Sequence, residues 1–142
     1  MAVTFALPAD FGYVILTSIA SIFVLMWKGF KVGEARKKYE VPYPKMYSDD
    51  DRFNCVQRAH QNTLENYPQF LILLVFAGLT FPKLSAAAGM VWIVGRVFYA
   101  LGYYSGDPKK RMRGVFAYIG LLTLLVCSII TALKMLGYVN FV

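Results

Sequence analysis

Charged side chains, cysteine and histidine are all scarce in this sequence. Asp, Glu, Lys and Arg make up 16% of its 142 residues, 58% are hydrophobic, and the mean hydropathy is +0.50. So little charge in so apolar a chain excludes an ordinary soluble domain and is typical of a protein that crosses a membrane several times. Cys55, Cys127 and the single histidine show no CxxC or Cys/His ligand spacing, so neither a disulfide framework nor a metal site is indicated.

Negative charge is the scarcer sign, with 8 Asp and Glu against 15 Lys and Arg. A net charge of +7 can indicate a nucleic-acid partner, but the cations here are concentrated in two connections between apolar segments. Residues 28–52 hold seven of them and residues 105–114 hold four, whereas none precedes the first apolar segment. The positive-inside rule places both connections in the cytosol and both termini outside it. We therefore expect contact with anionic membrane lipid and no nucleic-acid partner.

Four apolar segments can cross a bilayer, at about 11–30, 54–81, 84–104 and 115–133. A span needs about 20 residues, but the purely apolar run 70–81 has only 12, so the polar first half of the second segment must also lie at membrane depth. No positive n-region precedes the first segment, which we interpret as a retained span and not as a cleaved signal peptide. We expect a single all-α domain over residues 1–142, an integral membrane four-helix bundle.

The polar half of the second segment carries Arg58, Asn62 and Glu65 at positions i, i+4 and i+7, on one helical face. Ionisable groups at membrane depth are costly and usually face a bundle interior or a wet cavity. A second such face, at similar depth in the third segment, is formed by Arg96, Tyr99 and Tyr103. Together the two faces suit a small zwitterion with carboxylates and an amine. An Arg–Glu pair that only braces two helices explains the same residues equally well.

The stretches NCVQRAHQNTLENYP (54–68), GRVFYALGYYSGDPKKRMRG (95–114) and ARKKYEVPYP (35–44) resemble the MAPEG family of membrane glutathione-dependent enzymes. Within it, the chain is most similar to the third microsomal glutathione transferase subgroup. The resemblance implies four-helix subunits assembled as homotrimers, with active sites between adjacent subunits at the cytosolic side. It implies glutathione as co-substrate, without a metal, bound by residues that match Arg36, Arg58, His60, Asn62, Glu65, Tyr99 and Tyr103.

An arginine of the third connection is implied beside the glutathione sulfur. Arg111 matches it best, and Lys110 and Arg113 remain alternatives because this connection is one residue longer than in the cysteinyl-leukotriene synthase branch. Two departures accompany the resemblance: Asn66 replaces a tyrosine of that branch, and His60 replaces a glutamine.

The activity implied by the resemblance is that of a glutathione S-transferase and glutathione peroxidase. It would activate the glutathione thiolate for conjugation to lipophilic electrophiles and for reduction of lipid hydroperoxides, with cysteinyl-leukotriene synthesis as a related activity. The alternative is a non-catalytic lipid-binding partner of the 5-lipoxygenase-activating type. A channel is disfavoured because the polar groups gather in one leaflet. The expected location is the endoplasmic reticulum (microsomal) membrane, with the mitochondrial outer membrane as the alternative.

Overall fold

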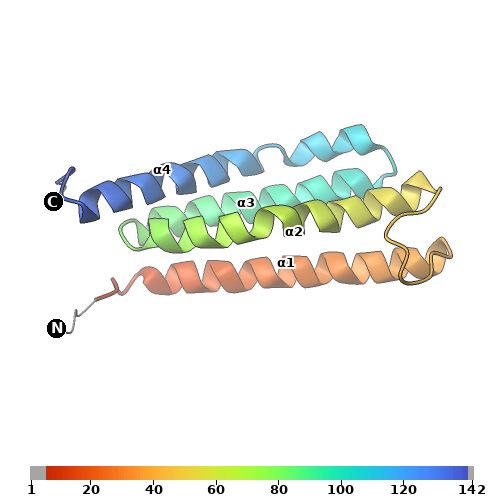
Figure 1. Cartoon of the computed structure of the whole chain (residues 1–142), viewed down its shortest axis with the longest axis horizontal. Coiled ribbons are helices and arrows are strands. Elements are labelled where there is room, and N and C mark those ends of the chain that lie inside the picture. The colour runs from red at the N-terminus through yellow and green to blue at the C-terminus, as the bar shows by residue number, and fades with distance from the viewer. Residues whose placement is uncertain (1–5, 141–142) are drawn as a thin grey trace.

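The computed structural model describes residues 6–140, which form four long α-helices and one short 3-10 helix. In chain order these are α1 (Phe11–Lys38), α2 (Asp51–Gly78), α3 (Pro82–Tyr104), η1 (Pro108–Gly114) and α4 (Ala117–Met135). The long helices lie side by side along one axis (Figure 1). The prediction of an all-α protein is confirmed.

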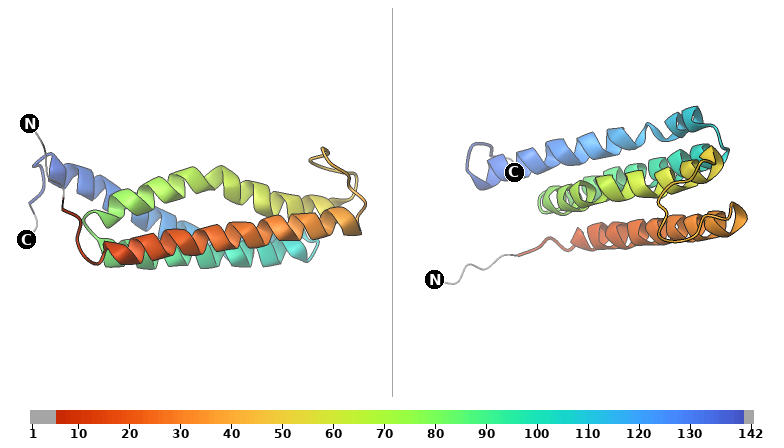
Figure 2. Two further views of the ribbon diagram at one scale, coloured as in Figure 1. Left: turned by 90° about the horizontal axis from the view of Figure 1, so that it is seen from below. Right: turned by 45° about the vertical axis from the view of Figure 1, so that its right-hand side comes forward.

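The middle of the bundle is formed by α2 and α3, with α1 on one side and α4 on the other (Figure 1). Of the four long helices, α2 and α3 each pack against the other three, and η1 packs against α3. The described ends of the chain lie at one end of the bundle, whereas the α1–α2 connection and η1 lie at the opposite end (Figure 2). The two cation-rich connections therefore lie at the same end, as the charge pattern predicts.

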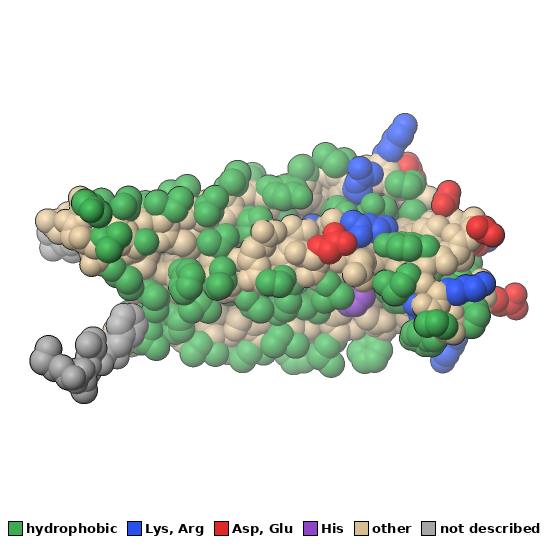
Figure 3. All heavy atoms as spheres, viewed as in Figure 1, with side chains coloured by type: hydrophobic (Ala, Val, Ile, Leu, Met, Phe, Trp, Pro, Cys, Tyr) green, Lys and Arg blue, Asp and Glu red, His purple; other side chains and the backbone are tan. Residues whose placement is uncertain are grey.

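Three of the helices, α1, α3 and α4, are long and apolar enough to cross a membrane. Helix α2 is not among them, because its first half is polar. Large hydrophobic side chains are exposed along the outside of the bundle, and charged side chains gather toward the end that carries the two connections (Figure 3). An apolar exterior of this extent is expected where lipid, and not water, is the solvent.

The N-terminus of α2 lies three residues earlier than predicted, because an aspartate caps it. The Asp50 carboxylate accepts a hydrogen bond from the Arg52 backbone N–H at 2.9 Å and pairs with the Arg52 guanidinium at 2.7 Å. Side-chain oxygens at this position satisfy backbone donors that the first helical turn leaves free. The hydrogen bonds from Arg52 also hold the pKa of Asp50 below its ordinary value.

The other helix boundaries shift by a few residues for local reasons. Helix α2 ends at Gly78 and not at residue 81, and α3 begins at Pro82, where a proline's missing N–H is not needed. Helix α4 begins at Ala117 and not at residue 115, because the preceding basic connection forms the tighter 3-10 turn η1. Each shift leaves the polar faces on the helices where they were expected.

A proline and an aromatic stack shape the middle of the bundle. Pro68 lies inside α2, and α2 is bent in its middle part (Figure 2), as expected where a proline removes a backbone hydrogen bond. Two residues after Pro68, the buried ring of Phe70 stacks on the buried ring of Trp92 with centroids 3.9 Å apart, which joins α2 to α3. This packing sets the rotation of the two helices about their axes, and with it the direction of their polar faces.

Candidate functional site

The polar face of α2 carries an ion pair. The guanidinium of Arg58 donates to both carboxylate oxygens of Glu65, at 2.9 and 3.3 Å, from two turns away on the same helix. Their side chains are 34% and 50% exposed. The pair lies within α2, so the interpretation as a brace between two helices is wrong. An exposed pair of this kind can exchange partners with a zwitterion, whose carboxylate would bind Arg58 and whose amine would bind Glu65.

The faces of α2 and α3 meet through Arg96, a buried arginine of α3 that is only 3% exposed. Its Nη2 donates to Asn62 Oδ1 at 2.5 Å and to Thr63 Oγ1 at 2.9 Å, and its Nε donates to the same hydroxyl at 3.2 Å. Asn62, which the spacing placed on the candidate face, is thus tied to the neighbouring helix. Two faces defined by helical period alone are therefore in direct contact.

Two tyrosines extend this contact toward the basic connection. The Arg96 guanidinium lies 4.2 Å from the centre of the Tyr99 ring, and Tyr99 packs edge to face against Tyr103 with centroids 5.1 Å apart. Tyr99 is half-buried and Tyr103 is buried. Both rings therefore lie against the bundle on the side of the α2 face and do not point away from it.

Arg111 of η1 lies beside these tyrosines. Its guanidinium lies 6.0 Å from the centre of the Tyr103 ring, and its Nη1 donates to the Pro108 carbonyl at 2.7 Å. Arg111 is half-buried, whereas Lys110 and Arg113 are exposed. The choice of Arg111 over Lys110 and Arg113 for the role beside the sulfur stays a prediction.

Close approach of η1 to α3 depends on two glycines. A Cβ added to Gly102 would collide with the Lys110 carbonyl, and one added to Gly114 would collide with the Gly95 carbonyl and Tyr99. Because neither glycine has a side chain, η1 packs directly on the backbone of α3. That packing holds the Arg111 segment beside the tyrosines.

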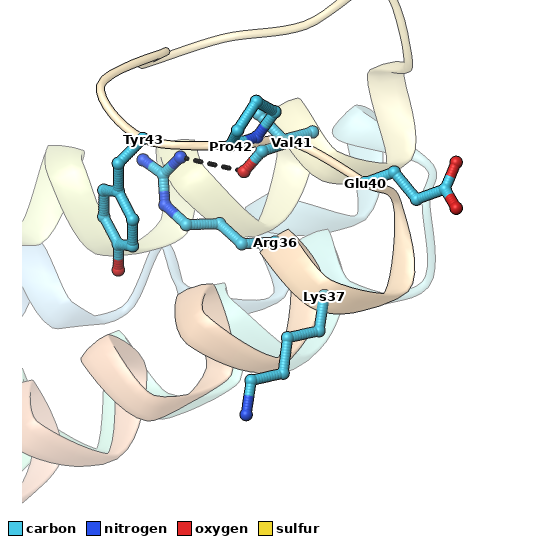
Figure 4. Close-up of a pocket in the computed structure, with 6 residues that line it drawn as sticks. All are labelled: Arg36, Lys37, Glu40, Val41, Pro42 and Tyr43. Atoms are coloured by element: carbon cyan, nitrogen blue, oxygen red, sulfur yellow. Dashed lines mark hydrogen bonds between the residues drawn. The ribbon is translucent and has the colours of Figure 1, made fainter.

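Arg36 lies near the end of α1, apart from this cluster. It donates to the carbonyls of Val41 and Lys45, at 3.4 and 2.8 Å, and its guanidinium lies 4.2 Å from the centre of the Tyr43 ring (Figure 4). Its Nε is buried and has no hydrogen-bond partner within the described part of the chain. A surface pocket of about 500 Å³ opens beside Arg36 and is lined by residues 36, 37 and 40–43. Among the described residues, no hydrogen bond or ion pair joins Arg36 to the α2 and α3 faces.

His60 lies on another face of α2, next to Gly29 of α1, and is half-buried. Its Nδ1 is buried and has no hydrogen-bond partner among residues 6–140. The predicted site residues thus divide within one chain into two groups. Group A comprises Arg58, Asn62, Glu65, Tyr99, Tyr103 and Arg111, and group B comprises Arg36 and His60.

The sequence interpretation missed a buried residue that is linked to Asn62 of group A only through Thr63 and Arg96. Lys28, the only charge in the first apolar segment, is completely buried, and its Nζ donates to Thr63 Oγ1 at 2.6 Å. A lone lysine in an apolar segment could have indicated a buried polar partner, since lysine is almost never fully buried without one. Helical period could not identify that partner, because Thr63 belongs to a different helix.

An apolar groove of about 560 Å³ lies between the start of α3 and α4, lined by residues such as Leu84, Leu122 and Val126. It is near the end of the bundle opposite to η1, so it does not adjoin group A. Across residues 6–140, no set of three His, Cys, Asp or Glu side chains is placed to hold a metal ion.

Comparison with known proteins gives matches along most of the chain. A model of the MAPEG family matches residues 14–133. Microsomal glutathione S-transferase 2 of Homo sapiens is 40% identical over 124 residues, which cover 87% of this chain and 80% of that protein. The Bos taurus protein of the same name is 39% identical over 111 residues, or 78% of this chain and 71% of the relative. Leukotriene C4 synthase of Bos taurus is 31% identical over 127 residues, or 87% and 82% of the two chains. Two of these relatives are named microsomal glutathione S-transferase 2. The expectation of the third microsomal subgroup is roughly consistent with them.

Proposed function

Because this chain belongs to the MAPEG family, we propose that it is an integral membrane enzyme that binds glutathione and activates its thiol for attack on lipophilic acceptors. The proposal rests above all on the hydrogen bond between Asn62 and Arg96, which joins the polar faces of α2 and α3. Relatives named as glutathione S-transferases support the same class of reaction.

Each group of the site has a role suited to its chemistry. Arg58 would bind a glutathione carboxylate, Glu65 the amine and Asn62 a peptide group, while the phenols of Tyr99 and Tyr103 border the ligand. The existing Arg58–Glu65 pair would open as the ligand's opposite charges replace each partner. Such an exchange leaves no charge unpaired, which keeps its cost low.

Arg111 would stabilise the thiolate. A free cysteine thiol has a pKa of about 8.5, and a nearby cation lowers such a pKa by about 1–3. Lowering the thiol pKa by about two units would leave the thiol mostly ionised at neutral pH. Each pKa unit corresponds to about 1.4 kcal/mol of preference for the thiolate. Arginine suits this role because its guanidinium stays charged when it is partly desolvated.

Two reactions follow from one activated thiolate. Attack on an electrophilic carbon forms a thioether and transfers the bond's electron pair to the leaving group or to an opened epoxide oxygen. Attack on a lipid hydroperoxide breaks the O–O bond to give a sulfenic acid and an alcohol. A second glutathione then forms the disulfide and releases water. Leukotriene C4 synthase among the relatives supports testing a leukotriene epoxide as one electrophile.

The complete site would form between subunits of a homotrimer. Group A and group B lie on separate parts of one chain, so one copy does not place both around a single ligand. A glutathione bound to group A of one subunit would meet group B of its neighbour. Closed rings of identical subunits repeat one such interface around the axis. A multi-pass topology in the endoplasmic reticulum, with the basic end in the cytosol, would give this site access to cytosolic glutathione.

The test is a binding and activity measurement on the purified protein in detergent. We expect saturable glutathione binding, and glutathione-dependent turnover of an aromatic electrophile and of a lipid hydroperoxide measured side by side. Glu65→Gln should weaken glutathione binding by about tenfold, because a neutral amide replaces the amine's counter-charge. Its melting temperature should hardly change, since an exposed ion pair adds little to stability.

Absence of saturable binding by the unmodified protein would refute the proposal and favour the lipid-binding alternative. Normal glutathione affinity in Glu65→Gln would mean that Glu65 pairs with Arg58 and does not bind the ligand. A matched control is Glu34→Gln, which removes an exposed carboxylate paired with Lys31 on α1.

A further inference from the structure

Thr63 is a buried threonine of α2 whose hydroxyl contacts two neighbouring helices. The hydroxyl donates to the Ala59 carbonyl of its own helix at 3.0 Å and accepts from Lys28 Nζ of α1 at 2.6 Å. It also accepts from Arg96 of α3, through Nε at 3.2 Å and Nη2 at 2.9 Å. A hydroxyl offers one proton and two lone pairs, so the hydrogen-bonding capacity of the Thr63 oxygen is fully used.

The same arginine determines which end of the Asn62 amide faces the candidate site. Arg96 Nη2 donates to Asn62 Oδ1 at 2.5 Å. A guanidinium carries only donors, so the amide oxygen must point toward Arg96 and the amide nitrogen away from it. Within residues 6–140, Asn62 Nδ2 has no hydrogen-bond partner and is not buried. Asn62 therefore offers N–H donors to a ligand on this face.

An N–H donor binds an acceptor, and the peptide carbonyls of glutathione are uncharged acceptors. We infer that Thr63 is a positioning residue of the glutathione site. Its hydroxyl fixes Arg96, and Arg96 holds the Asn62 amide with the N–H donors toward a peptide carbonyl of the ligand. This inference rests on the proposed function and adds a buried residue that acts on the ligand through two others.

Removal of the Thr63 hydroxyl tests this arrangement. Thr63→Val keeps the shape of the side chain but leaves the buried Arg96 Nε without its acceptor, so the guanidinium can turn away from Asn62. Thr63→Ser keeps the hydroxyl and is the matched control. Affinity for S-hexylglutathione, whose sulfur cannot ionise, is measured by calorimetry on the full chain in detergent. We expect Thr63→Val to weaken binding by about tenfold and Thr63→Ser by about twofold or less.

A double-mutant cycle separates positioning from a general loss of stability. Once Asn62→Ala has removed the amide, Thr63→Val should weaken binding by only about twofold or less, because Arg96 no longer has an amide to orient. The melting temperature should fall by similar amounts in both backgrounds, since the hydrogen bonds lost by Lys28 and Arg96 are the same. A purely structural role for Thr63 would weaken binding equally in both backgrounds.

The orientation of the amide has a test of its own. Asn62→Asp keeps an oxygen for Arg96 but has no N–H donor, so we expect it to weaken S-hexylglutathione binding by at least about tenfold. Asn66→Asp is the matched control. It adds the same charge one turn along the same helical face, next to the Asn62 backbone carbonyl to which Asn66 Nδ2 donates at 2.8 Å. Because the Asn62 amide stays in place, this control should weaken binding by about threefold or less.

The positioning role of Thr63 is overturned by unchanged affinity in Thr63→Val, by an equal loss in Thr63→Ser, or by the same loss in the Asn62→Ala background. Unchanged affinity in Asn62→Asp, or an equal loss in Asn66→Asp, would overturn the assignment of a donor at Asn62. If Thr63→Val does not fold, the cycle is measured in chains that carry Lys28→Met, in which no amine loses its hydroxyl partner. Failure of the unmodified protein to bind S-hexylglutathione would instead overturn the proposed function itself, so the two failures are distinguishable.

Discussion

At the scale of single residues, two arginines in the same region have different surroundings. Arg96 is buried and held by Asn62 and Thr63, whereas Arg111 is half-buried and held only by a carbonyl of its own turn. A guanidinium with free donors can turn toward a ligand, but one with fixed partners defines the shape of the site. Arg111 is thus the better candidate for contact with a reacting sulfur.

Replacing Arg111 with alanine tests this assignment. We expect Arg111→Ala to raise the pH midpoint of glutathione thiolate formation by about 1–3, because the thiolate loses its neighbouring cation. Glutathione affinity should fall much less, since the carboxylates and the amine bind elsewhere. The ultraviolet absorbance of the bound thiolate, followed against pH, measures the midpoint. Arg113→Ala removes an exposed arginine of the same turn and should leave the pH midpoint unchanged. A raised midpoint in Arg113→Ala with an unchanged one in Arg111→Ala would assign the role to Arg113.

At the scale of elements, the short helix η1 depends on the backbone of α3. Gly102 and Gly114 are the positions at which the two segments approach most closely, and a Cβ at either would meet backbone atoms that cannot yield easily. The basic turn therefore acts as part of the bundle and not as a free loop. Its arginine is placed by helix packing.

A methyl group at Gly102 should displace η1. We expect Gly102→Ala to reduce glutathione-dependent turnover by at least about tenfold, because a shift of about 1 Å in a catalytic group has effects of this size. Overpacking should also cost about 1–3 kcal/mol of stability. Turnover and the thermal unfolding midpoint are the measurements. The control is Gly12→Ala, at a helical glycine with open space around its Cβ position, which should keep full activity and be slightly stabilised. Full activity in Gly102→Ala would mean that η1 does not position the site.

At the scale of the whole molecule, one chain carries two separated halves of the proposed site. Group A faces one side of α2, while His60 and Arg36 lie against α1 and its connection. A single copy of the bundle does not bring them together. The proposed homotrimer would do so by repeating one interface around an axis.

Mixing two inactive variants tests this shared site. Arg36→Ala disables group B and Arg58→Ala disables group A, so each variant alone should be nearly inactive. When both chains are produced together, random assembly should restore about a quarter of the sites, those with an intact group from each neighbour. Turnover per chain after co-purification with two different tags is the measurement. Mixing the two variants after separate purification is the control, and an absence of recovery on co-expression would mean that each chain acts alone.

The membrane class and the candidate faces could be derived from the sequence by itself. Apolar length and the distribution of cations determine which segments can span, because these depend only on composition along the chain. The spacing of Arg58, Asn62 and Glu65 determines a shared face, because 3.6 residues per turn is a local property of any helix. The matching motifs also indicated the family.

Partners across helices were decided only by the tertiary structure. The rotation that packing imposes on each helix turned Arg96 toward Asn62 and Thr63, and Lys28 toward the same hydroxyl. It also separated Arg36 and His60 from the other predicted residues and placed the Arg58–Glu65 pair within one helix. Which side chains meet between helices depends on how the whole bundle fills space, and no period read along a single segment contains that information.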